Sequence, residues 1–145
     1  MILVLRKGKK SDLKSVLNIE IMAYEKPYWN QNMLFEVLAK KTDKRLWIYE
    51  VDNDVVGFII DMRHKDEISL LNLAVHKSLH GMGHGLKMLK KYIKSLPDKY
   101  SIYLEVNKNN IRALNMYSKL NFEKVSIRRS YYTDGGDAIN MQLVK

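Results

Sequence analysis

Three glycines at alternate positions, Gly81, Gly83 and Gly85, follow an almost wholly apolar run of residues and precede a helical pattern. A strand that leads through glycines into a helix brings free backbone N–H groups and the positive end of the helix dipole to one point. Glycine also permits unusual backbone torsions and the close approach of a ligand. The pattern predicts a phosphate-binding loop, although the glycines alone are equally typical of a turn that only joins a strand to a helix.

The glycine loop matches neither of the two common nucleotide-binding motifs. It lacks the Gly-Lys-Ser or Gly-Lys-Thr of a P-loop. Its glycine spacing, and the antiparallel strands expected before it, differ from a Rossmann fingerprint. The functional interpretation that remains is a pyrophosphate-binding loop of another type.

His76, His80 and His84 are spaced by four residues, so on an unbroken helix they would share one face, as metal ligands do. The glycines between them interrupt such a helix, and the segment contains no carboxylate. We therefore expect no metal site. These histidines and the isolated His64 are expected to lie near a phosphate or simply to be exposed.

Hydrophobic periodicity predicts the elements that would hold this loop. Strands are expected at Ile2 to Leu5, Leu46 to Val51, Val55 to Met62, Ile68 to Val75, Ser101 to Val106, Phe122 to Arg129 and Ala138 to Val144. Helices are expected from Ser11, after the capping residue Asn30, between Gly85 and Pro97, and from Asn109 to Leu120 with Asn121 as a left-handed cap. This order predicts a mixed α/β (α+β) fold whose helices cover a largely antiparallel sheet.

The same periodicity predicts which helix faces are buried, and a turn between two of the strands. Asp52-Asn53-Asp54 has the residue types of a hairpin turn. The first helix is expected to bury Leu13, Val16, Leu17, Ile19 and Ile21, and the third Leu86, Leu89, Ile93 and Leu96.

Composition bounds the class of protein. The 145 residues fit one domain, residues 1–145, because no linker-like stretch divides them. Cysteine is absent, no apolar run approaches the roughly 20 residues of a membrane span, and the N-terminus does not resemble a signal peptide. We therefore expect a soluble, cytoplasmic protein with no membrane partner.

The net charge of +9 favours a polyanionic partner, such as RNA or a phosphorylated cofactor, and argues against a polycationic substrate such as a polyamine. Because the lysines are scattered along the chain, solubility alone also explains the charge. Direct binding of nucleic acid is left open.

Two linked motifs resemble those of the GNAT superfamily. Leu73-Ala74-Val75 with His80-Gly81-Met82-Gly83-His84-Gly85 resembles its acetyl-CoA motif, Q/R-x-x-G-x-G/A, with His80 in place of Gln or Arg. Leu104-Glu105-Val106, followed by Asn110, Ala113, Tyr117 and Phe122, resembles the second half of that signature. The resemblance implies a sheet of about seven strands flanked by four helices, with acetyl-CoA as co-substrate and no metal. It implies that the cofactor is bound by Leu73, Ala74, Val75, Gly81, Met82, Gly83, His84, Gly85, Leu86, Asn110 and Tyr117.

The closing segments narrow the resemblance. Ile127 to Tyr132, with Asp134-Gly135 and the residues after it, closely resembles the ribosomal-protein-alanine N-acetyltransferase family, whose loop is slightly longer before its Asp-Gly. Pro27-Tyr28-Trp29 is similar to that family's Pro-Trp element. The implied acceptor is the N-terminal α-amine of a protein, for which a ribosomal protein that begins with alanine or a similar small residue is the family's example.

The resemblance also implies roles for single residues. Glu105 would be the general base that takes the proton of the amine, Tyr117 the general acid for the departing thiolate, and the Val75 N–H the donor to the thioester carbonyl. Four aromatic residues lie in connections and not at regular core spacing, so we favour a substrate groove over the core for them; they are Tyr28, Trp29, Tyr131 and Tyr132.

Two kinds of alternative stay open. A GNAT enzyme could instead acetylate a small-molecule amine or a protein lysine. A module that binds ribosomes or RNA without catalysis would also carry a positive charge. Release of coenzyme A in the presence of a peptide with a free N-terminus separates the module from the enzymes.

Overall fold

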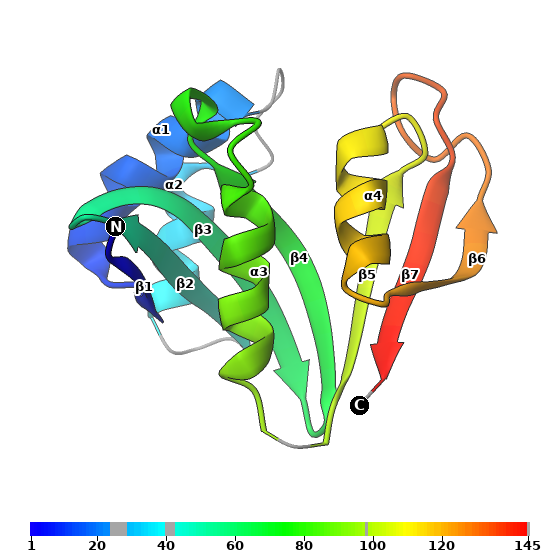
Figure 1. Ribbon diagram of the computed structural model, residues 1–145, viewed down its shortest axis with the longest axis horizontal. Coiled ribbons are helices and arrows are strands. Elements are labelled where there is room, and N and C mark those ends of the chain that lie inside the picture. Colours follow the sequence, from blue (N-terminus) through cyan, green and yellow to red (C-terminus); the bar gives the residue numbers. More distant parts are fainter. Residues whose placement is uncertain (24–28, 40–42, 98, 145) are drawn as a thin grey trace. The chain divides into compact units, whose positions relative to one another are not determined.

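The computed structural model describes residues 1–23, 29–39, 43–97 and 99–144 (Figure 1). The elements in chain order are β1 (Leu3–Lys7), the 3-10 turn η1 (Lys10–Asp12), α1 (Leu13–Ala23), α2 (Gln31–Leu38), β2 (Lys44–Val51), β3 (Asp54–His64), β4 (Glu67–Val75), the 3-10 turn η2 (Lys77–Leu79), α3 (His84–Lys94), β5 (Ser101–Asn107), α4 (Ile111–Lys119), β6 (Glu123–Arg128) and β7 (Ala138–Val144).

Among the described residues, seven strands form one sheet with the order β1-β2-β3-β4-β5-β7-β6. The pair β4 and β5 is parallel, whereas β1 with β2, β2 with β3, β5 with β7, and β6 with β7 are antiparallel. The predicted mixed, largely antiparallel sheet of seven strands with four helices is therefore confirmed. In the described part of the chain, no helix has both the length and the apolar character needed to cross a bilayer.

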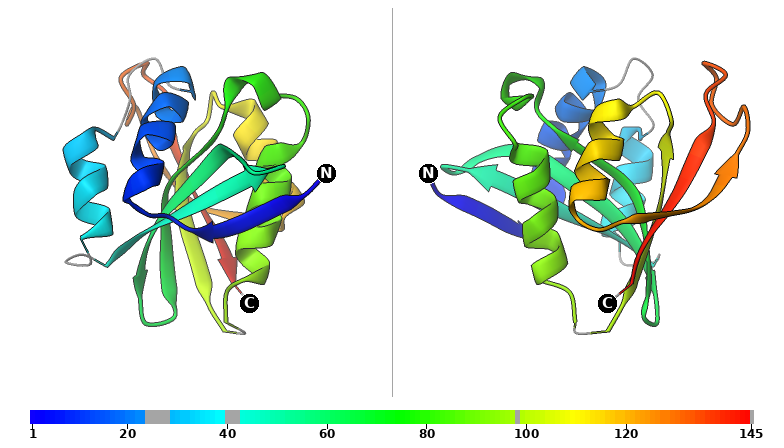
Figure 2. Two further views of the ribbon diagram at one scale, coloured as in Figure 1. Left: turned by 90° about the vertical axis from the view of Figure 1, so that its left-hand side faces the viewer. Right: turned by 45° about the vertical axis from the view of Figure 1, so that its right-hand side comes forward.

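Residue contacts divide the chain into two compact units, Met1–Met62 with Asn72–Ser95, and Arg63–Leu71 with Leu96–Lys145. In the first unit, α1 and α2 cover one face of the strands and α3 covers the other (Figure 2). Successive residues of a strand point to opposite faces. This alternation sends Leu46 and Ile48 of β2 toward α1 and α2, and Trp47 and Tyr49 toward α3.

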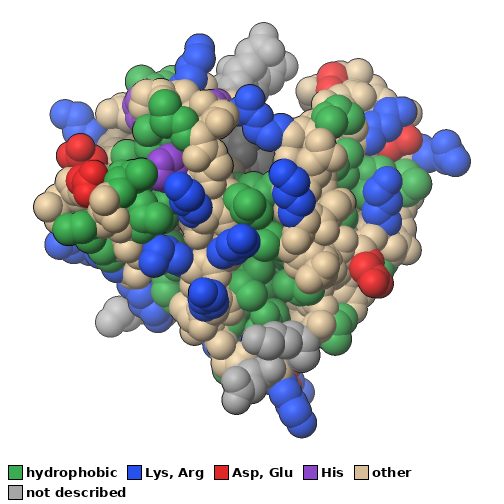
Figure 3. Space-filling view, in the orientation of Figure 1, with side chains coloured by type: hydrophobic (Ala, Val, Ile, Leu, Met, Phe, Trp, Pro, Cys, Tyr) green, Lys and Arg blue, Asp and Glu red, His purple; other side chains and the backbone are tan. Residues whose placement is uncertain are grey.

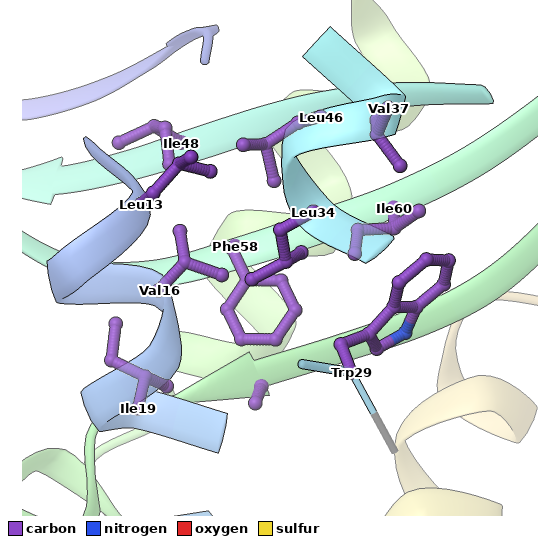
Figure 4. Close-up of a cluster of buried hydrophobic side chains, with 11 residues drawn as sticks. Leu13, Val16, Ile19, Trp29, Leu34, Val37, Leu46, Ile48, Phe58 and Ile60 are labelled. Atoms are coloured by element: carbon purple, nitrogen blue, oxygen red, sulfur yellow. The ribbon is translucent and has the colours of Figure 1, made fainter. Parts of the chain in front are cut away.

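The hydrophobic core of the first unit lies between the strands and the pair α1 and α2 (Figure 4). Asn30 begins α2 as predicted, since its side chain accepts a hydrogen bond from the Met33 N–H at 2.9 Å. The core cluster consists of Leu13, Val16, Ile19, Trp29, Leu34, Val37, Leu46, Ile48, Phe58, Ile60 and Ala74.

The expected burial of Ile21 is wrong, because that side chain is 61% exposed. The neighbouring Glu20 is fully buried instead. Its carboxylate accepts hydrogen bonds from the Trp29 N–H at 3.2 Å and from Asn72 Nδ2 at 2.9 Å. Because these bonds satisfy the carboxylate, a charged residue can occupy a helix position that hydrophobic periodicity assigns to the adjacent isoleucine.

The buried face of α3 also differs from the prediction. Leu89 is buried as expected, but Leu86 and Ile93 are only half-buried, while Met88 and Tyr92 are fully buried. The helix therefore presents to the sheet a face that contains polar and sulfur-bearing side chains, which a search for Leu and Ile alone does not find.

The fully buried Asp61 of β3 organises this face. It accepts two hydrogen bonds from Arg45, at 2.9 and 2.6 Å, one from Trp47 Nε1 at 3.2 Å and one from the Tyr92 hydroxyl. Burial, and then the nearby Asp61 charge, raise the pKa of Tyr92 above its usual range, so the hydroxyl keeps its proton. A buried carboxylate is tolerated here because an arginine and two neutral donors satisfy it.

In the second unit, β5 alternates as predicted, with Ile102, Leu104 and Val106 buried and Tyr103 and Glu105 on the more exposed side. The final hairpin of β6 and β7 is confirmed, but β7 and not β6 lies beside β5. After α4 the backbone is left-handed at Asn121, with a φ of 69°, as predicted for that cap.

We predict that Tyr92→Phe lowers the free energy of unfolding by about 1.5–3 kcal/mol, because the variant loses a buried hydrogen bond to a charged group. Urea unfolding measures the change. The matched control is Tyr103→Phe on the exposed side of β5, which should stay within about 0.5 kcal/mol of wild type. Equal stabilities for the two variants would contradict the role given to the Asp61 cluster.

Candidate active site

The glycine loop reverses the backbone between η2 and α3 through two left-handed residues. Gly81 has a φ of 82° and Gly83 a φ of 76°, and Gly83 is the N-cap residue of α3. A side chain at these torsions would cost about 1–2 kcal/mol, which explains the choice of glycine. A Cβ added at Gly81 or Gly83 would meet no heavy atom within 4 Å, so the space beside both glycines is open.

The N–H groups of the first turn of α3 have no acceptor within the helix. The N-cap Gly83 has no side chain to occupy them, and the first helical bond runs from the Lys87 N–H to the Gly83 carbonyl at 3.1 Å. Together with the open space beside the glycines, these donors fit the phosphates of a nucleotide cofactor. The residues expected to bind a pyrophosphate, Gly81 to Leu86, therefore lie together at this helix start.

Lys and Arg side chains are frequent on the surface that carries α3 (Figure 3). The helix contains Lys87, Lys90, Lys91 and Lys94 and no acidic residue. Such a helix adds a positive field to the first-turn donors, which favours an anionic ligand.

Each of the three histidines spaced by four makes a different local contact. His76 Nδ1 accepts from the Ser78 N–H at 3.1 Å and so caps η2. His80 Nε2 lies 2.8 Å from the Val75 carbonyl oxygen. His84 is buried, and its Nδ1 is 2.9 Å from the Tyr49 hydroxyl, so the expectation of an exposed side chain is wrong for His84. Among the described residues no three His, Cys, Asp or Glu side chains gather as they would around a metal ion.

Three residues before the glycine loop are also expected to bind the cofactor. They are Leu73, Ala74 and Val75, which end β4. Ala74 and Val75 are buried, and Leu73 is half-buried. The Val75 N–H, which is predicted to polarise the thioester, therefore lies at the end of β4, shortly before the glycine loop in the chain.

In the second unit, Glu105 stands in a polar row that crosses three strands. Glu105 of β5 pairs with Asn140 of β7, and Asn140 pairs with Ser126 of β6, to which its Nδ2 donates at 2.7 Å. The Arg128 guanidinium lies 3.7 Å from the Glu105 carboxylate and 5.3 Å from the ring centroid of Tyr131. The Glu105 side chain keeps 34% exposure, so its carboxylate is accessible to solvent.

The two residues predicted on the second motif helix have different surroundings. Tyr117 is buried, and its ring packs against Phe122 with centroids 5.5 Å apart. Asn110 caps α4, because its Oδ1 accepts from the Ala113 N–H at 3.2 Å. The cap by itself accounts for an asparagine at position 110.

The four aromatic residues predicted to line a groove do not share one environment. Tyr131 is 53% exposed and Tyr132 is half-buried, with ring centroids 5.1 Å apart. Burial, and then the Glu105 charge, raise the pKa of Tyr132. Trp29 is 4% exposed within the core cluster, so its indole supports the core and does not line an open surface. Tyr28 lies outside the described residues.

Asp134 fixes the loop that carries the two tyrosines. Its carboxylate accepts from the Gly136 N–H at 2.7 Å and from Asn107 Nδ2 at 3.0 Å, and Asn109 Nδ2 lies at 3.4 Å. The Tyr132 N–H donates to the Gly136 carbonyl at 3.1 Å. The β6–β7 loop is thereby attached to the end of β5, two residues after Glu105.

Arg128 and Asp134 are contact residues that the sequence did not predict. Asp134 precedes Gly135, a recognisable turn signal, but the turn does not indicate which side chains it contacts. The contact of Arg128 with Glu105 depends on the register of β5, β7 and β6, which residue spacing does not reveal.

The chain is similar to known acetyltransferases over most of its length. The acetyltransferase (GNAT) family model matches residues 13–122. The chain is 31% identical to the [ribosomal protein bS18]-alanine N-acetyltransferase of Escherichia coli, over 92% of this chain and 91% of that protein. It is 27% identical to an N-alpha-acetyltransferase of Sulfurisphaera tokodaii, over 94% of this chain and 90% of that protein. The crystal structure of the Escherichia coli ribosomal-protein-S18-alanine N-acetyltransferase superposes with a TM-score of 0.87 at 28% identity, over 99% of this chain and 94% of that one.

We predict that the Asp134 contacts persist at neutral pH and are lost only in strong acid. The Gly136 N–H bond first, and then the Asn107 bond, lower the pKa of Asp134, so its carboxylate is still ionised at the ordinary aspartate value of about 3.9. The Gly136 amide resonance, followed by NMR during acidification, should titrate with a midpoint below that value. The Asp134→Asn variant should lose this titration, and a midpoint at or above the ordinary value would contradict the contact.

Proposed function

The chain belongs to the GNAT acetyltransferase family, and we propose that it transfers the acetyl group of acetyl-CoA to the N-terminal α-amine of a protein. The observation that carries the proposal is similarity over nearly the full chain to relatives whose names specify N-terminal acceptors. We further propose that the chain, residues 1–145, acts as one cytoplasmic domain, and that its acceptor is a ribosomal protein.

Binding of the cofactor's pyrophosphate is assigned to the first unit. The N–H groups from Gly81 to Leu86 would hold the pyrophosphate, and the lysines of α3 add favourable charge. The remaining expected contacts, Leu73 to Val75, Asn110 and Tyr117, are assigned to the rest of the cofactor. Acetyl-CoA supplies an activated acetyl thioester, whose carbonyl accepts a hydrogen bond from the Val75 N–H.

Proton transfer is assigned to the second unit. Glu105 has a carboxylate that is exposed enough to accept the proton of an attacking amine. Tyr117 carries the proton for the departing thiolate, and its ring is buried against Phe122. Tyr131 and Tyr132, on the loop attached by Asp134, supply apolar surface for the first residues of the acceptor.

A protein N-terminus is a better acceptor than a lysine side chain at neutral pH. Its pKa of about 8 lies below the value of about 10.4 for lysine, so far more of it is neutral and nucleophilic. A spermidine N-acetyltransferase of Vibrio cholerae has the same fold at 17% identity. Similarity at that level indicates a shared fold and not a shared acceptor. The net charge of +9 disfavours a polyamine.

We predict that Glu105→Gln lowers kcat by about 10²- to 10⁴-fold, since glutamine cannot accept the amine proton. The dissociation constant of acetyl-CoA should stay within about 3-fold of wild type, because the carboxylate acts on the acceptor and not on the cofactor. Coenzyme A release with an alanine-started peptide measures kcat, and calorimetry measures the binding.

The matched control is Glu123→Gln on the exposed strand β6, which removes the same charge from the same unit. It should keep wild-type turnover. Unchanged turnover in Glu105→Gln would remove Glu105 as the base.

We predict that Tyr117→Phe lowers kcat by about 10- to 100-fold through the loss of general acid catalysis. The apparent KM for the peptide should change little, since the hydroxyl acts on the leaving group. A tenfold rise in KM with normal kcat would contradict this assignment.

A further inference from the structure

The end of β4 carries a contact that the motif alone does not explain. We propose that His80 is a positioning residue for acetyl transfer, and that its ring holds the last peptide group of β4 and thereby fixes the direction of the Val75 N–H. The proposal rests on the proposed function, in which that N–H polarises the thioester carbonyl.

The peptide group between Val75 and His76 is hydrogen-bonded at both of its polar atoms. The Val75 carbonyl oxygen is 2.8 Å from His80 Nε2, and the His76 N–H donates to the Val56 carbonyl at 2.7 Å. A peptide group is planar, so two such bonds fix the orientation of the whole plane. The preceding plane, which carries the Val75 N–H, is joined to it through a single Cα whose side chain is buried.

The local sequence brings His80 back to β4 through one 3-10 turn. In η2 the Leu79 N–H donates to the His76 carbonyl at 2.9 Å, and the His80 N–H donates to the Lys77 carbonyl at 3.1 Å. The His76 ring accepts from the Ser78 N–H and stabilises the start of the same turn. His80 therefore stands at the end of a turn that is itself held by backbone bonds.

The contact determines which ring nitrogen carries a proton. A carbonyl oxygen can only accept, so His80 Nε2 must be the donor. That nitrogen serves the protein backbone and is not available to an anionic ligand.

A contact with a carbonyl oxygen requires an N–H donor but no charge. Glutamine carries such donors at the end of its side chain, as the histidine does, whereas leucine carries none. A contact with a pyrophosphate would instead favour a positively charged side chain.

The variants His80→Gln and His80→Leu separate these roles. If the ring positions Val75, His80→Leu should lower kcat by about 10- to 100-fold, as a small misplacement of a catalytic donor does. His80→Gln should restore kcat to within about 3-fold of wild type, and neither variant should change the dissociation constant of acetyl-CoA by more than about 3-fold. The control is His64→Leu, an exposed histidine at the end of β3, which should match wild type.

A second readout does not depend on activity. Hydrogen exchange of the His76 amide, followed by NMR, should be slow in wild type and in His80→Gln and at least tenfold faster in His80→Leu, because the peptide plane is then held at one end only. If the wild-type protein showed this exchange pattern and yet no turnover, that result would overturn the proposed function, while the hydrogen bond of His80 to β4 would still be supported.

Three results would overturn the proposal. The first is equal exchange in wild type and His80→Leu. The second is weaker acetyl-CoA binding at unchanged kcat, which would make His80 a phosphate contact. The third is an equal loss of kcat in the Gln and Leu variants together with lower thermal stability, which would make the residue merely structural.

Discussion

The path of the backbone from the end of β4 to the start of α3 is the constraint on which the site depends. The strand ends in a peptide group held by two hydrogen bonds, and the chain then passes through η2 and two left-handed glycines before the helix starts. A helix leaves the N–H groups of its first turn without acceptors, so the residue at which α3 starts determines where these donors lie. A different torsion at Gly81 or Gly83 would move those donors and the Val75 N–H relative to each other.

Buried polar groups keep this path in place. In the first unit Asp61 ties α3 to β2, His84 contacts Tyr49 beneath the start of α3, and Glu20 joins α1 to Asn72 of β4. Each of these groups has hydrogen-bonding partners, so the cost of burying it is offset. In the second unit the corresponding polar contacts are more exposed, and there Asp134 attaches the β6–β7 loop to the end of β5. Both arrangements hold elements of the fold together by polar contacts, most of whose partners are far apart in the sequence.

Elements and turns could be predicted from the sequence because they depend on neighbours. The Asn30 cap, the alternation of β5 and the left-handed Asn121 all follow from residues within one or two turns. The side of α3 that faces the sheet could not be predicted, since His84, Met88 and Tyr92 are buried by partners on β2 and β3. The same limit applies to Arg128, whose contact with Glu105 requires the strand order β5-β7-β6.

The position of the acetyl group on a product distinguishes an N-terminal acceptor from a lysine acceptor. The substrate is a peptide that begins with alanine and contains an internal lysine, incubated with the wild-type chain and acetyl-CoA and analysed by tandem mass spectrometry. If the acceptor is an N-terminal α-amine, we expect acetylation of the alanine and none on the lysine. Acetylation confined to the lysine, or no acetylated product together with no release of coenzyme A, would contradict the proposed function.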